Sequence, residues 1–419
     1  MHPSHYRHGS HRVRRSAPRP RRVAASALVL AGLGLLALPS AANASQLLVP
    51  AVGVPDAAMN GATVATPRTA TAAAFSNPAG IVNLAPGSVS AAFGLPVGHS
   101  QVHATTPPGY DTTSDFVAYA PEGGAVFETG PGLRWGFGVY GSLGATFDSD
   151  KDPSVGVDHD FQSSTAVSNV ALMMAYPLTD RLSVGVALAV MYGQAHLRYH
   201  QGKQFAYTVR GAGVQSIVGL RYRLSDKVAL GAGFRTPGRI WADGDDPVAA
   251  GDKQDVELNL DMPAQVFLGV NADATDRLHL GLCFRWTDAS TFSDSKFRFD
   301  ETPAADIPYI RSASDEWRIA AGADYALTEA LSVSAGVSYA DEIVPDAWVS
   351  PLLIDSAEWK ISAGTAWQLP GRFSDWTVDL AFGHSPTGER NVSDADAAVF
   401  PGRYTIGGQI YMIGLRTTL

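Results

Sequence analysis

The 419-residue sequence contains a single cysteine, and this scarcity excludes two kinds of structural support. Cys283 has no partner for an intramolecular disulfide bond, and zinc sites built on several cysteines are excluded as well. The sequence also lacks a nucleotide-binding motif. We therefore predict a protein with no metal and no cofactor, whose function does not use nucleotide hydrolysis.

Basic charge is also scarce. The formal net charge is −9, and removal of residues 1–44, which hold seven arginines and no acid, would give −9 − 7 = −16. A protein that binds nucleic acid needs a net basic surface to meet the phosphates. The charge therefore argues against a nucleic-acid partner.

Long apolar runs are missing outside the N-terminus, so no transmembrane helix is predicted in the body of the chain. The one apolar run, Val23–Leu38, follows a group of arginines and precedes the small residues Ala42-Asn43-Ala44. This pattern predicts a cleaved signal peptide over residues 1–44 and a mature chain that starts at Ser45. The alternative, an uncleaved anchor helix, is disfavoured because the run is short and interrupted by glycine.

Residues 45–86 are rich in Ala, Thr, Gly and Val and follow neither a helical nor a strand period. Only Asp56 and Arg68 are ionisable in this stretch, whereas disordered tails usually carry more charge. We therefore predict a small compact plug, or hatch, over residues 45–86. Within it, Asn77-Pro78-Ala79-Gly80 predicts a rigid turn, because Asn bonds locally, Pro fixes φ and Gly accepts positive φ.

From residue 87 to 419 the dominant pattern is alternation. In residues 182–192, Leu, Val and Tyr side chains alternate with Ser, Gly, Ala and Met, and this period of two runs further than in most soluble strands. Similar alternation predicts fourteen strands, which start near residues 87, 123, 133, 165, 181, 206, 227, 255, 277, 315, 330, 357, 374 and 404.

Short turns and longer polar loops also alternate along the chain, as in outer-membrane barrels. A strand protein in hydrocarbon must close its sheet to pair every backbone N–H and C=O. We therefore predict an all-β fold, a transmembrane antiparallel β-barrel of about fourteen strands over residues 87–419. The alternative, a soluble β-sandwich, would not explain the regular alternation of short and long connections.

The sequence resembles the FadL/OmpP1/TodX family of outer-membrane transporters for long-chain fatty acids and other hydrophobic compounds. The resemblance is carried by the hatch motif in residues 75–80 and by segments at residues 175–185, 219–224, 258–263, 275–278, 315–318 and 322–325. It implies a fourteen-stranded barrel with an N-terminal hatch, which captures hydrophobic ligands outside and releases them sideways through a gap in the wall. It further implies the outer membrane of a Gram-negative-type bacterium, with membrane lipid, lipopolysaccharide and the barrel assembly machinery as partners.

The sequence departs from the family pattern at two places. Pro67-Arg68-Thr69 replaces the acidic residues that often precede the hatch motif, and this leaves the ligand preference open. The chain ends in Leu419 rather than in an aromatic residue, which weakens the assembly signal.

Several cations are expected to face the lumen, because their positions have the opposite parity to the apolar face of each strand. A fatty-acid carboxylate that leaves water needs a cationic partner. Together with Leu47 and Leu48 of the hatch, the predicted ligand-binding candidates are Arg221, Arg235, Arg285, Arg318 and Lys360. The alternative is a structural role, since Asp324 and Asp379 have the same inward parity and could pair with them.

We predict that Asn77, Pro78, Ala79 and Gly80 form the gating hatch, and that ligand capture shifts the segment around Leu47 and Leu48. The predicted function is passive, hatch-gated uptake of hydrophobic molecules, with long-chain fatty acids as the favoured substrate. Neutral aromatic or alkane hydrocarbons are the alternative substrates. Two other classes remain: an outer-membrane lipid-modifying enzyme, for which Gly98-His99-Ser100 in a predicted loop is the nearest Ser/His pair, and an inert structural or adhesive barrel.

Overall fold

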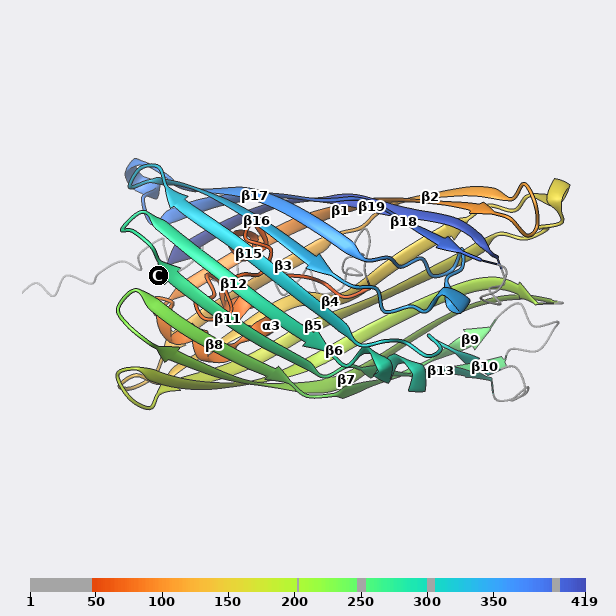
Figure 1. Ribbon diagram of the computed structural model, residues 1–419. Coiled ribbons are helices and arrows are strands. Elements are labelled where there is room, and N and C mark those ends of the chain that lie inside the picture. The colour runs from red at the N-terminus through yellow and green to blue at the C-terminus, as the bar shows by residue number, and fades with distance from the viewer. Residues whose placement is uncertain (1–46, 202, 247–253, 300–305, 394–399) are drawn as a thin grey trace, which may run out of the picture.

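The computed structural model describes residues 47–419 except 202, 247–253, 300–305 and 394–399. The described chain forms a closed antiparallel β-barrel of fourteen strands with its N-terminal segment inside (Figure 1). The predicted barrel is thereby confirmed. The predicted signal peptide and its cleavage site lie outside the described residues. Among the described residues, no helix has the length and apolar character needed to cross a membrane.

The strand order follows the sequence around the barrel, and β19 pairs with β1 from Ser88↔Thr418 to Ala104↔Gly402, which closes the wall. The fourteen wall strands are β1 (Ser88–Ala104), β3 (Ala120–Glu128), β4 (Arg134–Ser149), β5 (Phe161–Pro177), β6 (Leu182–Gln201), β7 (Lys203–Arg223), β8 (Val228–Arg235), β11 (Gln265–Asp273), β12 (Leu278–Thr287), β15 (Glu316–Ala326), β16 (Leu331–Ala340), β17 (Glu358–Gln368), β18 (Trp376–Val392) and β19 (Gly402–Thr418).

The barrel has two unlike ends. Short turns gather at the end where the C-terminus lies, here called the turn end, and the long connections gather at the opposite loop end (Figure 1). Strand β2 (Asp111–Val117) continues β3 toward the loop end, and an extension beside β7 contains β9 (Gly238–Asp246), β10 (Gln254–Met262), β13 (Lys296–Phe299) and β14 (Ile307–Pro308).

Two sequence predictions about strands were wrong in detail. The strand expected near residue 255 is β10, which pairs with β9 and β13 in the extension, and the eighth wall strand begins at Gln265. Pro263 separates the two strands, since proline has no N–H to give to a ladder. The predicted loop that contains Gly98-His99-Ser100 is strand, because β1 extends to Ala104 and pairs with β2.

Strand lengths differ around the barrel. Strands β4 to β7 contain 16, 17, 20 and 21 residues, whereas β11, β12 and β15 contain 9, 10 and 11. The wall of β4–β7, like that of β1, β18 and β19 with 17 residues each, therefore extends beyond β11, β12 and β15 toward the loop end. On all these strands large apolar side chains point outward, as in Leu188 and Leu282, each 53% exposed. This band is the surface that faces lipid.

The hatch contains three short helices: α2 (Val54–Ala57), α3 (Ala70–Ser76) and the 3-10 helix η2 (Pro78–Asn83). Thr69 caps α3, since its Oγ1 accepts a hydrogen bond from the Ala72 N–H at 3.1 Å. Most hatch residues are buried, and Val64, Phe75 and Ile81 share an apolar cluster with inward side chains of the wall. The hatch is therefore a packed core element of the barrel.

Inward-facing glycines bring the hatch backbone directly against the wall. A Cβ atom at Gly281 would lie 1.8 Å from the Ala62 carbonyl oxygen, and one at Gly233 would lie 1.8 Å from that of Ser76. The glycine belt, found on eleven wall strands, consists of Gly124, Gly138, Gly185, Gly219, Gly231, Gly233, Gly269, Gly281, Gly322, Gly336, Gly364 and Gly414. At each of these positions a side chain would occupy the space of the hatch.

Replacement of Gly281 by valine should detach the hatch locally, because the added side chain would overlap the Ala62 carbonyl group. We expect the Gly281→Val variant to destabilise hatch docking by about 1–3 kcal/mol or more. Hydrogen exchange of hatch amides in the folded barrel would measure the loss. Ala232→Val, on the outward face of β8, is the control and should leave protection unchanged. Equal hatch protection in both variants would contradict the prediction.

Candidate functional site

The predicted turn at residues 77–80 holds the hatch to the wall. Asn77 is fully buried; its Oδ1 accepts a hydrogen bond from the Ala79 N–H at 3.2 Å. Its Nδ2 donates to the carbonyl oxygens of Val64 (2.9 Å) and Leu220 (3.0 Å). Asn77 therefore links the turn, a second hatch segment and strand β7 through one side chain.

A buried carboxylate organises the hatch from inside. Asp56 accepts hydrogen bonds from the Thr63 hydroxyl (2.7 Å), the Arg68 N–H (3.0 Å) and the Thr69 hydroxyl (3.2 Å). These bonds bring α2 and the segment before α3 together. Asp56 was one of the two ionisable residues noted in this stretch of sequence, but its role depends on contacts that spacing alone does not reveal.

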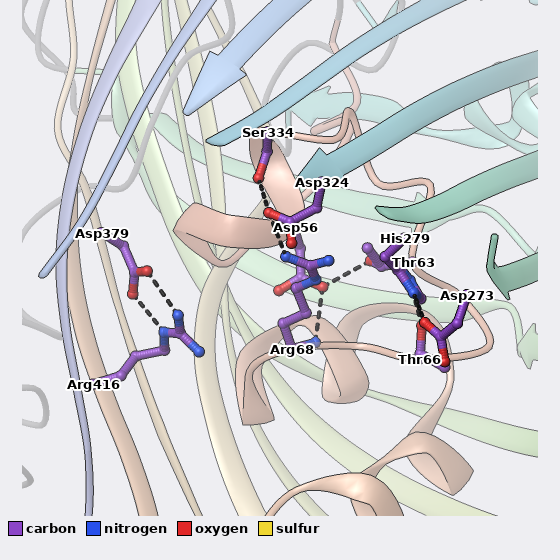
Figure 2. Close-up of polar contacts among 10 residues, drawn as sticks. All are labelled: Asp56, Thr63, Thr66, Arg68, Asp273, His279, Asp324, Ser334, Asp379 and Arg416. Atoms are coloured by element: carbon purple, nitrogen blue, oxygen red, sulfur yellow. Dashed lines mark hydrogen bonds and ion pairs between the residues drawn. The ribbon is translucent and has the colours of Figure 1, made fainter. Parts of the chain in front are cut away.

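At the turn end, polar contacts join the hatch to the wall (Figure 2). Arg68 forms an ion pair with Asp324 at 3.1 Å, and Thr66 lies 3.3 Å from His279 Nε2. Arg68, which stands where the family often has acids, is thus a hatch anchor. Beside them, Arg416 binds Asp379 through two hydrogen bonds of 2.5 and 2.8 Å.

All five predicted lumenal cations point inward, and three of them bind the hatch backbone. Arg221 donates to the Ala65 carbonyl at 3.0 Å and Arg285 to the Val49 carbonyl at 2.9 Å. Arg235 donates to the Phe75 carbonyl and lies 4.7 Å from the centre of the Phe75 ring. These contacts give the three arginines a structural role in holding the hatch.

The other two cations differ from each other. Arg318 donates to the Ser338 hydroxyl at 2.7 Å and lies 3.7 Å from the Glu358 carboxylate. The ammonium group of Lys360 shows no hydrogen bond or ion pair with any described residue, although the side chain is only 8% exposed. Lys360 lines a small cavity that Glu122 and Val49 also line. Among the five candidates, Lys360 is thus the cation available to a ligand.

The wall is discontinuous beside this cavity. The β3–β4 ladder ends at Gly123↔Val139, and the register of β4 shifts between Gly141 and Leu143. This discontinuity, here called the wall gap, lies between residues 120–122 of β3 and residues 140–142 of β4. The family resemblance predicted a gap in the wall but not its position, because the residues at the shift, Gly141 and Ser142, are small and hide the change of inward and outward faces.

The start of the hatch fills the wall gap. Val49 N–H donates to the Ser142 carbonyl at 3.1 Å, and Gly144 N–H donates to the Leu47 carbonyl at 2.9 Å. Leu48 forms a bridge with Leu143. The Glu122 carboxylate also accepts a hydrogen bond of 2.6 Å from the Gly53 N–H. The segment at residues 47–49 thus pairs with β4 at its register shift, beside the wall gap, and the Gly53 N–H reaches the opposite side of the gap.

Leu47 and Leu48 also belong to a large apolar cluster that fills the loop end. It joins them to Leu143 and Met191 on the wall, to aromatic residues of the extension, and to a loop at residues 341–357. The loop contributes Ile343, Val344, Val349 and Ile354. One face of the 47–49 segment therefore meets an apolar interior, and its backbone meets the wall gap.

Asp355 holds this loop closed. Its buried carboxylate accepts hydrogen bonds from the N–H groups of Ile343 (2.7 Å) and Val344 (3.0 Å). Burial raises the pKa of Asp355 to about 7, while the two N–H groups act in the opposite direction. Arg390 of β18 and Glu316 of β15 are the charged neighbours of this carboxyl group.

The Ser/His pair considered for an enzyme is not assembled. Gly98-His99-Ser100 lies within β1 rather than in a loop, so neighbouring side chains face opposite sides of the wall. His99 points outward and pairs with Asp115, whereas Ser100 is buried on the inner side. Among the described residues, no cluster of three or more His, Cys, Asp or Glu side chains forms a metal site.

Comparison with known proteins agrees with this architecture. Residues 35–418 match the family model described as outer membrane protein transport protein (OMPP1/FadL/TodX). This chain belongs to the FadL/OmpP1/TodX family. The family consists of outer-membrane channels for hydrophobic compounds, not enzymes, and the protein is accordingly an outer-membrane β-barrel.

Solved structures of similar fold include a FadL homologue from Pseudomonas aeruginosa, with 17% identity, a TM-score of 0.75 and coverage of 89% of this chain and 99% of that chain. The toluene transporter TodX of P. putida has 16% identity and a TM-score of 0.68, and TbuX of Ralstonia pickettii has 18% and 0.67. Both comparisons cover 88% of this chain and 99% of the other. No curated protein matches this sequence.

Loop closure should depend on pH through Asp355. The pKa of Asp355 is raised above its ordinary value of 3.8. The contribution of Asp355 to loop closure is therefore complete below pH 3.8 and is lost as the pH rises through about 7. We expect faster hydrogen exchange of the Ile343 and Val344 amides at about pH 8.5 than at about pH 5.5, after correction for intrinsic rates. Asp355→Asn should remove this difference, and the control Asp346→Asn should retain it. A pH dependence that persists in Asp355→Asn would contradict the prediction.

Proposed function

We propose that the protein is a passive channel that takes up hydrophobic small molecules and releases them through the wall gap. One observation carries the proposal: the 47–49 segment pairs with β4 beside the wall gap, and its Leu47 and Leu48 side chains belong to the apolar cluster at the loop end. A ligand that displaces Leu47 and Leu48 from the cluster would also disturb the bonds that fill the gap. Capture and opening would thus be coupled through one short segment.

The proposed route runs from the apolar cluster through the cavity beside Lys360 to the wall gap. In favour of this route, Val49, Glu122 and Gly141 all line the cavity, so it adjoins both the 47–49 segment and the gap. A sideways exit lets an apolar molecule enter lipid without crossing water. No energy source beyond the concentration gradient is needed, in keeping with the lack of a nucleotide motif.

The hatch is proposed to contain a fixed part and a mobile part. Asn77, Pro78, Ala79 and Gly80 would hold the fixed part against β6 and β7, and the gate would be the segment that contains Leu47 and Leu48. Support comes from the number of close contacts between residues 54–79 and the glycine belt. This proposal includes a division into a signal peptide (1–44), hatch (45–86) and barrel (87–419), and insertion by the barrel assembly machinery.

Long-chain fatty acids are the proposed substrates, and Lys360 is the proposed partner of the carboxylate. The support is an unpaired ammonium group in a cavity that adjoins the exit. Neutral aromatic hydrocarbons are the second candidate, because TodX and TbuX, which share the fold, are toluene transporters. Arg221, Arg235, Arg285 and Arg318 would contribute only indirectly, through the hatch and the wall.

Equilibrium binding of a long-chain fatty acid and the matching neutral alkane to the detergent-folded protein separates these substrates. We expect the acid to bind more tightly, and Lys360→Met to weaken its binding by about tenfold while sparing the alkane, because a charge-assisted contact is lost. Lys227→Met, at an exposed turn, is the matched control. Equal binding of both ligands to the wild type would favour a hydrocarbon channel, and binding of neither would reject the transport proposal.

A reversible cross-link tests the gate. In a Cys283→Ala background, Leu48→Cys and Leu143→Cys should form a disulfide bond, because paired antiparallel residues have suitable Cα separations of about 4.5–5.5 Å. We expect ligand uptake into proteoliposomes to stop when the pair is oxidised and to return on reduction. Ligand binding at the loop end should survive oxidation. Uptake that continues at full rate with the disulfide formed would exclude the proposed exit.

A further inference from the structure

We propose that the outward face of β5–β7 at the loop end binds a phosphorylated glycolipid of the outer leaflet, of the lipopolysaccharide type. The site, here called the polar belt, consists of Gln162, Gln194, His196, Arg198, Thr208 and Arg210. This inference goes beyond the proposed uptake function and does not depend on it.

The polar belt begins where the apolar lipid-facing band ends. On β6 the outward side chains are Val186, Leu188 and Val190, then Tyr192 at 50% exposure, and then Gln194. Tyr192 lies where an interfacial aromatic residue is expected in a barrel. Residues one row further toward the loop end therefore lie at the level of lipid headgroups.

Neither guanidinium group in the belt forms an ion pair with a described residue, although the Asp148 carboxylate lies near enough to Arg198 to interact with its charge. Arg210 is exposed, and its Nε donates only to the Gln194 side chain, at 3.0 Å. The Nε of Arg198 is buried and has no hydrogen-bond partner, and no ion pair of either arginine with a described residue is seen. Arginine binds phosphate with several parallel hydrogen bonds, so both groups are available to an external phosphate.

The residues between the two arginines form an ordered polar row. His196 Nδ1 lies 2.8 Å from the Thr208 hydroxyl, and its Nε2 lies 3.2 Å from Gln162 Oε1. Such contacts across three strands fix the side chains in place. Amide, hydroxyl and imidazole groups held in a plane are suited to hydrogen bonds with the hydroxyl groups of a sugar.

The spacing of the arginines points to a lipid with two phosphates. Arg210 pairs in register with Gln194, and Arg198 lies four residues further along β6. At about 3.3 Å per residue, their backbone positions lie about 13 Å apart along the strand. A single phosphate is too small to meet both guanidinium groups, whereas a disaccharide with a phosphate at each end can reach both.

Acidic residues flank the belt and limit its width. Asp148 on β4 is the register partner of Gln162, and Asp243 on β9 is the register partner of Arg210. Neither carboxylate forms an ion pair with Arg198 or Arg210 in the described part of the chain. An anionic ligand is therefore expected on the strip between them, over β5–β7.

Lipid binding to the intact, delipidated barrel in detergent tests the proposal. The probes are bisphosphorylated lipid A and, as a single-phosphate lipid, phosphatidylglycerol, with bound lipid measured by native mass spectrometry. We expect tighter binding of lipid A, and a loss of roughly tenfold to thirtyfold in its affinity for Arg198→Gln/Arg210→Gln. Thermal stabilisation by lipid A should decrease in parallel.

The matched control is Arg181→Gln/Arg223→Gln, which removes two exposed arginines from the turn end of the same two strands. This control should bind lipid A as the wild type does. An unchanged affinity of the belt variant, or an equal loss in the control, would overturn the assignment to this face. Equal wild-type affinity for both lipids would overturn the assignment to a lipid with two phosphates.

Discussion

The close approach of the hatch backbone to inward glycines is the constraint on which the rest of the structure depends. A side chain at any of these positions would enter the space of the hatch, and at Gly233 and Gly281 the approach is to a hatch carbonyl oxygen. Arg221, Arg235 and Arg285 then bind hatch carbonyl groups that no strand can satisfy. The glycines leave space for the hatch, and the arginines donate hydrogen bonds to its carbonyl groups. The hatch can therefore fill the lumen although it forms no continuous β-ladder with the wall.

The N-terminal segment consists of two parts that differ in the contacts that hold them to the wall. Residues 54–79 contact nearly the whole circumference, and their displacement would expose many buried polar groups at once. Residues 47–49 have two backbone hydrogen bonds to β4, one bridge and one hydrogen bond from Arg285. The free-energy cost of moving the two parts therefore differs, and the proposed mechanism uses this difference, with the short segment displaced by ligand and the rest left in place.

The barrel could be predicted from sequence because its signal is local. Alternation in residues 182–192 assigned both the strand and the two faces of β6, and the same parity placed Lys360 in the lumen. The position of β10 was not predictable, since a strand in the extension and a strand in the wall have the same period. The roles of Arg221 and Arg285 depend on hydrogen bonds to the carbonyl groups of residues 65 and 49. Contacts between residues so far apart in the sequence cannot be read from the spacing of side chains along the chain.

The position of the wall gap and the role of Glu122 were not predictable for a related reason. The register shift at Gly141 is a single residue, and the hydrogen bond from Gly53 to Glu122 joins segments that sequence analysis had treated separately. Likewise, the change from apolar to polar outward side chains on β6 after Tyr192 can be seen in the sequence. That the polar side chains continue across β5 and β7 follows only from the register of the three strands.

The closure of the wall between β1 and β19 has a consequence for the order of assembly. These partners are separated by 298 (402 − 104) to 330 (418 − 88) residues, and the hatch touches strands along most of the chain. Contacts over such separations form late, because the entropy of closing the loops must be met first. Closure of the wall and docking of the hatch therefore both depend on segments far apart in the sequence, and we expect these contacts to form after the local strand pairs.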